Sequence, residues 1–135
     1  MKNKSELRDI IIKVIYQVFL LDEAKLDYDL NNLIKEQLEV ENEFVNNCCM
    51  GIIKNRKAIT KKANQYLNNW KLDRLNKVDQ AIISLGIYEL LYTDTPSVVC
   101  INEAIELSKK YSEEQVTKMI NGVLDSIYHE EEKDE

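Results

Sequence analysis

The sequence predicts an all-α fold, a compact helical bundle. Only three glycines and one proline occur among its 135 residues, so few positions interrupt a helix. The β-branched residues recur at helical spacing and do not alternate as they would in strands. A chain of this size buries roughly 70% of the surface that its unfolded form exposes, which is enough for one core. We therefore expect one bundle of about seven helices.

Four helices are expected in the first half of the chain, over residues 5–21, 28–38, 44–55 and 56–69. Ser5 is the expected N-cap of the first helix. Its apolar stripe consists of Leu7, Ile11, Val14, Ile15 and Val18. Gly51 lies inside the third helix, where glycine costs about 1 kcal/mol relative to alanine. A close helix crossing would explain this glycine.

Three further helices are expected in the second half. One covers residues 75–92 and ends at "TDTP", and the next begins after Pro96. Ser112 and Gln115 match a capping box, which predicts the start of the seventh helix. Gly122 lies inside this helix, where it would let another helix approach closely. Residues 129–135 are nearly all acidic and predict a solvated tail.

Several classes of protein are disfavoured by composition. No stretch approaches the ~20 consecutive apolar residues of a membrane span, and the N-terminus lacks a secretory signal pattern, so the cytoplasm is the expected location. Cys48, Cys49, Cys100 and the single His129 match neither a disulfide framework nor a metal-ligand spacing. No nucleophile with a nearby base and no phosphate loop can be assembled. We therefore expect no enzyme activity, no metal and no cofactor.

Charge is segregated along the chain. The net charge of −6 argues against a protein that coats nucleic acid non-specifically. The N-terminus nevertheless carries Lys2, Lys4 and Arg8, and residues 54–62 contain five cations and no acid. We interpret the second run as a solvated helix face, with a track for nucleic acid as the alternative.

Residues 74–127 contain several ordered blocks that point to a known family. These are Val78-Asp79, "YELLY" at 88–92, Pro96, "INEAIEL" at 101–107 and "NGVLD" at 121–125. The N-terminal "LRDIIIKVIYQ" fits as well, with Arg8 and Tyr16 where the family has an arginine and an aromatic residue. On these blocks the chain resembles the NusB transcription antitermination family over nearly its whole length.

This resemblance implies a fold and a role. The fold is a single NusB-like domain over residues 1–128, made of two packed helical subdomains at roughly 1–70 and 71–128, followed by a flexible acidic tail at 129–135. The implied role is to bind the boxA element of nascent ribosomal RNA together with NusE, a small-subunit ribosomal protein. The complex helps RNA polymerase resist termination, and the family does this without catalysis.

The resemblance also implies an RNA-binding site at the edges of these blocks. Its residues are Lys2, Lys4, Arg8, Tyr16, Gln115, Lys118 and Met119. Lysine and arginine would hold phosphates, and Tyr16 would stack on a base. The family's arm is often arginine-rich where this chain has Ser5 and Glu6, and Met119 replaces a frequent phenylalanine. We therefore expect weak binding to boxA alone and tighter binding with NusE.

Asp79, Tyr88 and Glu89 are the residues implied for the NusE interface. NusE-like ribosomal proteins are basic, so an acidic helix face would steer their association. For Asp79 a solvated surface position is equally compatible with the sequence. For Tyr88 a core position is favoured, because it belongs to the apolar stripe.

A second function from another class remains open. The chain would then be a helical protein-interaction adaptor with little RNA binding of its own. The dependence of RNA affinity on salt separates the two functions, because phosphate contacts release counterions.

Overall fold

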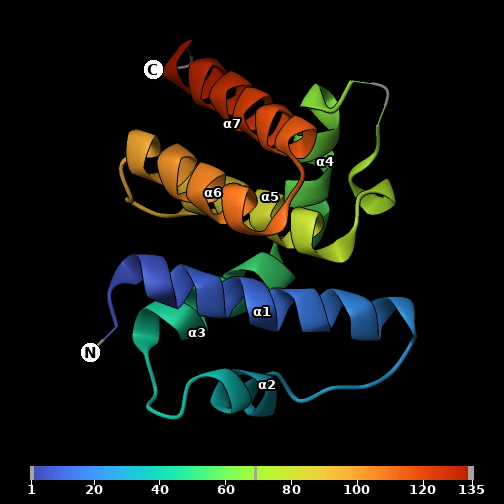
Figure 1. The fold of residues 1–135 in the computed structure, drawn as a ribbon, viewed down its shortest axis with the longest axis vertical. Helices are drawn as coiled ribbons and strands as arrows, with labels where there is room; N and C mark the ends of the chain where they lie inside the picture. The colour runs from blue at the N-terminus through green and yellow to red at the C-terminus, as the bar shows by residue number, and fades with distance from the viewer. Residues whose placement is uncertain (1, 69, 134–135) are drawn as a thin grey trace.

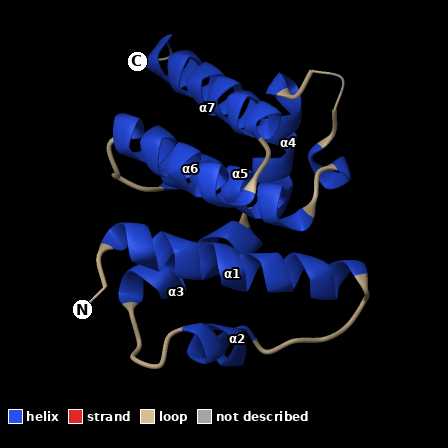
Figure 2. Ribbon diagram, in the orientation of Figure 1, coloured by secondary structure: helices blue, strands red, loops and turns tan. Residues whose placement is uncertain are grey.

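A computed structural model describes residues 2–68 and 70–133 of the chain. These residues form seven α-helices and one short 3-10 helix, and no strand occurs among them (Figure 2). None of these helices combines the length and the apolar character needed to cross a membrane. The elements are α1 (Lys4–Glu23), α2 (Leu30–Gln37), α3 (Glu43–Lys54), α4 (Arg56–Tyr66), η1 (Leu72–Arg74), α5 (Lys77–Tyr92), α6 (Ser97–Tyr111) and α7 (Glu114–Lys133).

Helix α5 is the central element of the bundle. It packs against α1, α3, α4, α6 and α7, and residues 79–87 within it are all buried. A helix that is buried around its whole circumference lacks a polar face, so its sequence reads as a nearly continuous apolar run. The largest fully buried side chains include Phe19, Ile82, Ile87 and Leu124, which come from α1, α5 and α7. The predicted all-α bundle is confirmed.

The helices lie in two groups around α5. Figure 1 shows α1, α2 and α3 together in the lower half, and α4 with α5, α6 and α7 in the upper half. Helix α4 accordingly packs against α5 and α7. The buried apolar residues of both groups belong to one continuous cluster. The predicted boundary between two subdomains near residue 70 stays a prediction. The packing of α4 with α5 and α7 does not follow that boundary, because α4 precedes residue 70 in the chain.

The first helix begins slightly earlier than expected because Asn3, not Ser5, is its N-cap. The side chain of Asn3 accepts from the Glu6 N–H at 2.8 Å, and the Glu6 carboxylate accepts from the Asn3 N–H at 3.2 Å. This reciprocal pair satisfies two backbone donors at the helix end. Ser5 instead donates its hydroxyl to Glu103 of α6 at 2.7 Å.

The two ends of α7 also differ from expectation. The predicted capping box is wrong, because the Ser112 hydroxyl donates to Asp79 and the Gln115 amide donates to Glu113 at 3.3 Å. At the other end the helix continues to Lys133, through most of the predicted acidic tail. Glu130 holds this segment, accepting from Tyr66 at 2.5 Å and from Lys62 at 3.3 Å. Residues 134–135 lie outside the described part.

The glycines have different surroundings. A Cβ at Gly51 would overlap the ring of Tyr88 on α5, which confirms the close helix crossing predicted there. A Cβ at Gly122 would meet nothing within 4 Å, and the residue is exposed. The prediction that Gly122 allows another helix to approach is therefore wrong. It faces an open groove instead.

Candidate nucleic-acid interface

The main concave feature near the start of α7 is a groove with aromatic and apolar walls. It has a volume of about 520 Å³ and lies between the end of α4, the segment before α5 and the first turns of α7. We call it the aromatic groove. Its principal walls are Tyr66, Trp70, Leu75, Gln115, Met119 and Gly122, and none of the residues that line it is charged. Trp70 is 54% exposed, so its indole ring is available for stacking.

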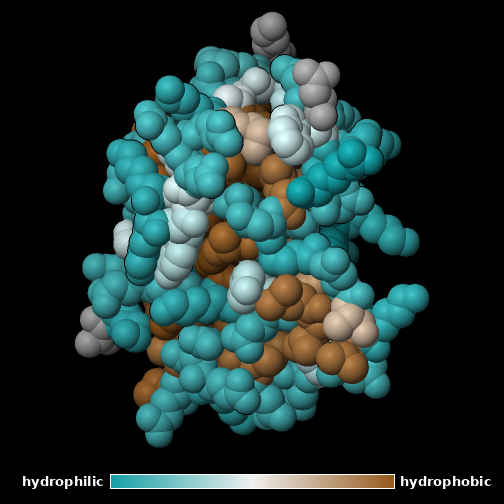
Figure 3. Space-filling model, turned by 45° about the vertical axis from the view of Figure 1, so that its right-hand side comes forward, coloured by the Kyte–Doolittle hydropathy of each residue, from teal (hydrophilic) through white to brown (hydrophobic). Residues whose placement is uncertain are grey.

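A second hollow adjoins the aromatic groove. It has a volume of about 570 Å³ and is lined by Tyr16, Leu20 and Glu23 of α1 and by residues 73–78 before and at the start of α5. Leu75 lines both depressions, so they meet at this side chain. We call them together the aromatic face. Figure 3 shows the corresponding apolar surface over the C-terminal part of α1 and near the N-terminal end of α7.

Charged side chains occur in the hollow and beside the groove. Arg74 and Lys77 line the hollow together with Glu23 and Asp73, and Lys77 pairs with Glu23 at 2.6 Å. Lys118 projects from α7 with its side chain 78% exposed, and its ammonium lies 3.8 Å from Glu114. The groove itself is uncharged, and the exposed Arg74 and Lys118 lie beside it. This arrangement suits a single strand of nucleic acid, whose bases stack and whose phosphates need counter-charge.

Three predicted RNA-binding residues meet at this face. Tyr16, at 38% exposure, lies in the hollow, while Gln115 and Met119 line the groove on the other side of Leu75. Lys118 is on the same first turns of α7 but lines neither depression. The structure thus brings residues from the two ends of the chain together, as the resemblance implies.

Lys2 and Lys4 lie at the opposite end of α1. Twelve residues separate Lys4 from Tyr16 on this helix, which corresponds to about 18 Å. The Lys4 ammonium lies over the ring of Phe44 at 4.9 Å. Lys2 lines a mixed-charge hollow with Asp9 and Lys110. An RNA that touches both the arm and the aromatic face would have to run along most of α1.

Asp9 anchors one side of this mixed-charge hollow. Burial alone would raise the pKa of the Asp9 carboxyl, but hydrogen bonds from Tyr111, Lys110 and Lys13 outweigh it and hold the pKa below its ordinary value. The Tyr111 hydroxyl donates to Asp9 at 2.5 Å and the Lys110 ammonium at 3.0 Å. The carboxylate therefore stays ionised and offsets the neighbouring cations, so the hollow is a poor place for phosphate.

Arg8 has an internal place in the fold instead of the exposed one expected for a phosphate contact. The residue is 2% exposed, and its Nε lies 3.0 Å from both carboxylate oxygens of Glu89. Its Nη1 lies 3.7 Å from Glu103. Burial raises the pKa of Glu89 even though the Arg8 guanidinium opposes the shift. Arg8 thus joins α1 to α5 and α6.

The residues implied for the partner interface are also mostly internal. Asp79 is 3% exposed and Glu89 is 1% exposed, so neither side chain presents a surface charge. Asp79 instead accepts from Ser112 and fixes the turn between α6 and α7 against α5. Tyr88 is half-buried, stacks on Tyr92 with ring centroids 5.6 Å apart, and donates to the Asn47 carbonyl at 3.4 Å. Its predicted core position agrees with this packing.

The pH dependence of stability should change in Asp79→Asn. Burial and the nearby Glu113 raise the pKa of Asp79 above 3.8, while Ser112 and Asn76 oppose the shift. A carboxyl whose pKa is raised on folding favours the folded state when protonated, and this contribution is lost as pH rises through the folded pKa. As pH rises above 3.8, the stability of Asp79→Asn relative to the wild type should therefore increase, until the pH has passed the raised pKa of Asp79 in the folded state. Urea unfolding at several pH values measures this.

Ser112→Ala provides the matched comparison. It removes a donor that lowers the pKa of Asp79 and leaves the carboxyl in place, so the loss of stability with rising pH should become steeper. Identical pH profiles for the wild type and both variants would contradict the assigned role of Asp79.

The described residues offer little for catalysis. Burial raises the pKa of Cys48, Cys49 and Cys100 to about 12 in each case, so these thiols are not activated nucleophiles. No cluster of three or more potential metal-binding side chains occurs in the part of the chain that the structure describes.

Trp70 and Lys71 were not among the residues predicted to bind RNA. The sequence predicts a helix over residues 56–69, whereas α4 ends at Tyr66 and Trp70 lies in the following segment. A tryptophan between turn-forming asparagines and a basic Lys71 was the available signal, because tryptophan is enriched at interfaces.

An aromatic face with cations at its edges, built on a helical bundle, defines an all-α binding protein. Comparison with known proteins is more specific, because the model of the NusB family matches residues 5–129. The chain belongs to the NusB family. It is 39% identical to the transcription antitermination protein NusB of Methylacidiphilum infernorum, over 94% of this chain and 91% of the relative.

Solved structures agree with this assignment. T. maritima NusB superposes with a TM-score of 0.82 at 32% identity, covering 96% of this chain and 92% of the other. The NusB fold also matches a crystal structure of the antitermination factors NusB and NusE in complex with double-stranded RNA. Here the TM-score is 0.78 at 25% identity, over 93% of this chain and 96% of the matched one.

Proposed function

We propose that this protein is an RNA-binding transcription antitermination factor of the cytoplasm. With NusE it binds the boxA element of nascent ribosomal RNA and helps RNA polymerase resist termination, acting by binding and not by catalysis. The observation that carries this proposal is the aromatic face, an exposed stacking surface with cations at its edges on a NusB-family fold.

The aromatic face has the groups that single-stranded RNA recognition requires. Trp70 and Tyr16 offer ring planes on which unpaired bases stack, and such stacking contributes roughly 1–3 kcal/mol per base. The side-chain amides of Gln115 and Asn68 line the groove and can donate to and accept from base edges. Arg74 and Lys118 lie at the edges, where phosphates would pass.

The basic arm contributes less in this proposal than the resemblance implies. Because Arg8 is buried with Glu89, the exposed cations at the start of α1 are Lys2 and Lys4. This supports weak binding to RNA by the chain alone, with NusE supplying further contacts. The same observation favours the adaptor as the second candidate function.

Asp79 and Glu89 act from inside the fold in this proposal. They hold the α6–α7 turn and α1 against α5, and so keep the surface presented to NusE in place. Tyr88, half-buried beside Tyr92, is the one residue of the three with a side chain partly open to a partner.

Titration of a short boxA RNA, with and without NusE, tests the proposal. We expect weak binding by the chain alone, tighter binding with NusE, and a loss of about 1–3 kcal/mol in binding free energy for Trp70→Ala. Trp70→Phe keeps a stacking ring and should retain most of the affinity. Val98→Ala, at an exposed apolar position away from the aromatic face, is the surface control.

Three outcomes would count against this function. Full affinity of the lone chain would remove the need for NusE, and equal affinity of Trp70→Ala and wild type would remove the aromatic face from the site. No RNA binding even with NusE, combined with intact binding to NusE, would establish the adaptor instead.

A further inference from the structure

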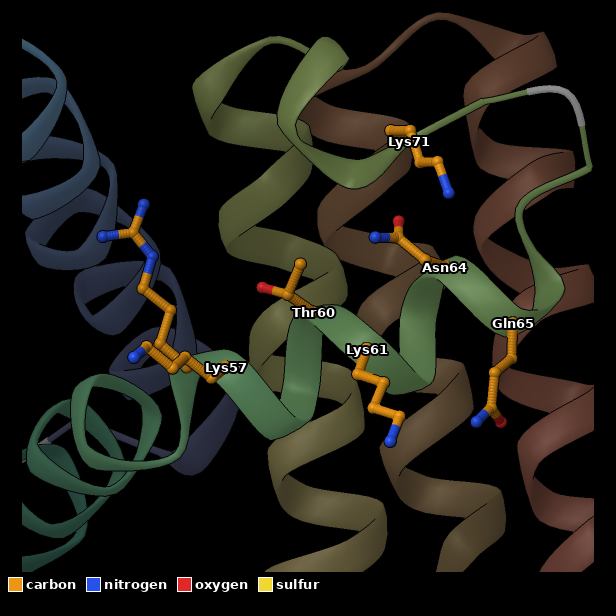
Figure 4. Close-up of a pocket in the computed structure, with 7 residues that line it drawn as sticks. Lys57, Thr60, Lys61, Asn64, Gln65 and Lys71 are labelled. Carbon is orange, nitrogen blue, oxygen red and sulfur yellow. The ribbon is translucent and has the colours of Figure 1, made fainter.

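A basic hollow lies along α4 beside the aromatic groove. It has a volume of about 620 Å³, and its cations are Arg56, Lys57, Lys61 and Lys71. Figure 4 shows Lys57 and Lys61 following one another along α4, with Lys71 on the segment that returns above Asn64. We call this the α4 hollow. None of the described residues that line it is acidic, although the whole chain carries 24 acids against 18 lysines and arginines.

The charge pattern is unusual for a merely solvated helix face. No aspartate or glutamate occurs between Glu43 and Asp73, so α4 has no internal acid to balance its cations. Lys57 and Lys61 are four residues apart, where like charges destabilise a helix. Solvated helices commonly alternate charge signs to avoid this repulsion. On α4 this repulsion between lysines is not balanced by acids, as expected for a surface that binds an anion.

The lysines of the α4 hollow remain available for a ligand. Arg56 is held by Asp22 at 2.6 Å and lies over the ring of Phe19 at 4.1 Å. By contrast, no ion pair among the described residues involves Lys57, Lys61 or Lys71, and all three are exposed. Arg56 therefore forms one end of the α4 hollow, and the three lysines provide the positive charge that is available to a ligand.

The α4 hollow and the aromatic groove share one segment of chain. Gln65 and Lys71 line the hollow, while Tyr66 and Trp70, their immediate neighbours, line the groove. At the end of this segment, the Asn64 side-chain oxygen accepts from the Leu72 N–H at 2.8 Å and so ties Leu72 to α4. A single strand of RNA whose bases stack on Trp70 would therefore reach Lys71 next.

We propose that the α4 hollow binds the phosphate backbone of the single-stranded RNA that flanks the segment held in the aromatic groove. This inference rests on the proposed function and extends its RNA footprint. The hollow offers lysines with the polar side chains of Thr60, Asn64 and Gln65 between them. It lacks large apolar or aromatic lining residues, which anchor most protein partners, so the hollow suits a backbone better than a peptide.

The test compares two RNAs in the presence of saturating NusE. One is the short boxA segment and the other carries single-stranded flanks of about ten nucleotides on both sides. The triple variant Lys57→Gln, Lys61→Gln, Lys71→Gln should bind the short RNA like the wild type and the long RNA about tenfold more weakly. For the long RNA, the slope of log affinity against log salt should fall by about 2, since each single-strand phosphate contact contributes roughly 0.7.

The matched control is Lys25→Gln, Lys35→Gln, Lys109→Gln, which removes the same charge from exposed positions outside the hollow. It should leave both affinities and both slopes near wild type. Equal effects of the two triple variants would reduce the result to overall charge and overturn the inference.

The remaining outcomes separate this inference from the proposed function. If the wild type binds the long RNA no better than the short one, the α4 hollow has no RNA role while the proposed function stands. If neither RNA binds, the proposed function fails and this inference fails with it. If the triple variant loses binding to a polyglutamate peptide but not to the long RNA, the hollow is a site for acidic protein and the inference is wrong.

Discussion

Arg8→Ala is expected to lower the free energy of unfolding by about 3–5 kcal/mol. Arg8 and Glu89 are both almost fully buried, and the Arg8 Nε lies 3.0 Å from each carboxylate oxygen. Removing the guanidinium leaves the Glu89 carboxyl buried without its counter-charge and beside Glu103. Urea unfolding at neutral pH measures the loss. Truncation of an exposed phosphate-binding arginine would cost far less stability.

Two further variants separate the ion pair from other effects of truncation. Lys4→Ala removes an exposed cation one turn earlier and should change stability by less than about 0.5 kcal/mol. Arg8→Met combined with Glu89→Leu removes both charges together, and should recover most of the loss because an apolar pair leaves no buried charge. A mild effect of Arg8→Ala, or no recovery in the double variant, would contradict the internal role.

The distinction matters for any RNA measurement on Arg8. A variant that unfolds at the assay temperature loses binding whether or not Arg8 touches RNA. Binding should therefore be measured where the variant is folded, and there we expect near-wild-type affinity per folded molecule. Lys4→Ala, which removes an exposed cation of the arm, should weaken binding without unfolding the protein.

The internal position of Arg8 could have been read from the sequence. In α1 it lies four residues before Ile12 and seven before Ile15, both of which are buried, so it belongs to the apolar stripe of the helix. A charged residue in such a stripe is usually buried with a partner. The partner Glu89, 81 residues further along the chain, could not be deduced without the fold.

The sequence of helix α5 predicts its burial but not the places of its polar residues. Its run "VDQAIISLGIYELL" predicts a helix, and its nearly continuous apolar character indicates burial on all faces. Burial on all faces also encloses Asp79 and Glu89, which the resemblance placed at a partner surface. A polar residue in a central helix is therefore better interpreted as a structural hydrogen-bonding group until an exposed neighbour is identified.

Only some residues of the aromatic face could be predicted from the sequence. Tyr16, Gln115 and Met119 followed from the resemblance, but Trp70 and Leu75 join them only because the segment after α4 folds back beside α7. Such tertiary juxtaposition has no local sequence signal. The unbalanced cations of α4 were visible in the sequence, whereas their position beside Trp70 was not.

Gly51→Val and Gly122→Ala are expected to change stability in opposite directions. A side chain at Gly51 overlaps the Tyr88 ring, which packs on Tyr92 and bonds to Asn47, so Gly51→Val should destabilise by roughly 1–3 kcal/mol. Gly122 has open space around it, so Gly122→Ala should stabilise by about 1 kcal/mol through helix propensity alone. Thermal and urea unfolding of both variants measure the contrast.

The Tyr88 ring provides the decisive control for Gly51. In a Tyr88→Ala background the obstructing ring is gone, so Gly51→Val should cost clearly less than in the wild type, and the difference is the coupling between the two sites. Equal costs in both backgrounds would mean that the ring is not the obstacle.

For Gly122 the stability gain should come with weaker RNA binding, since the new methyl group narrows the aromatic groove. A glycine that reduces helix stability without aiding packing is then explained by the space it leaves for a ligand.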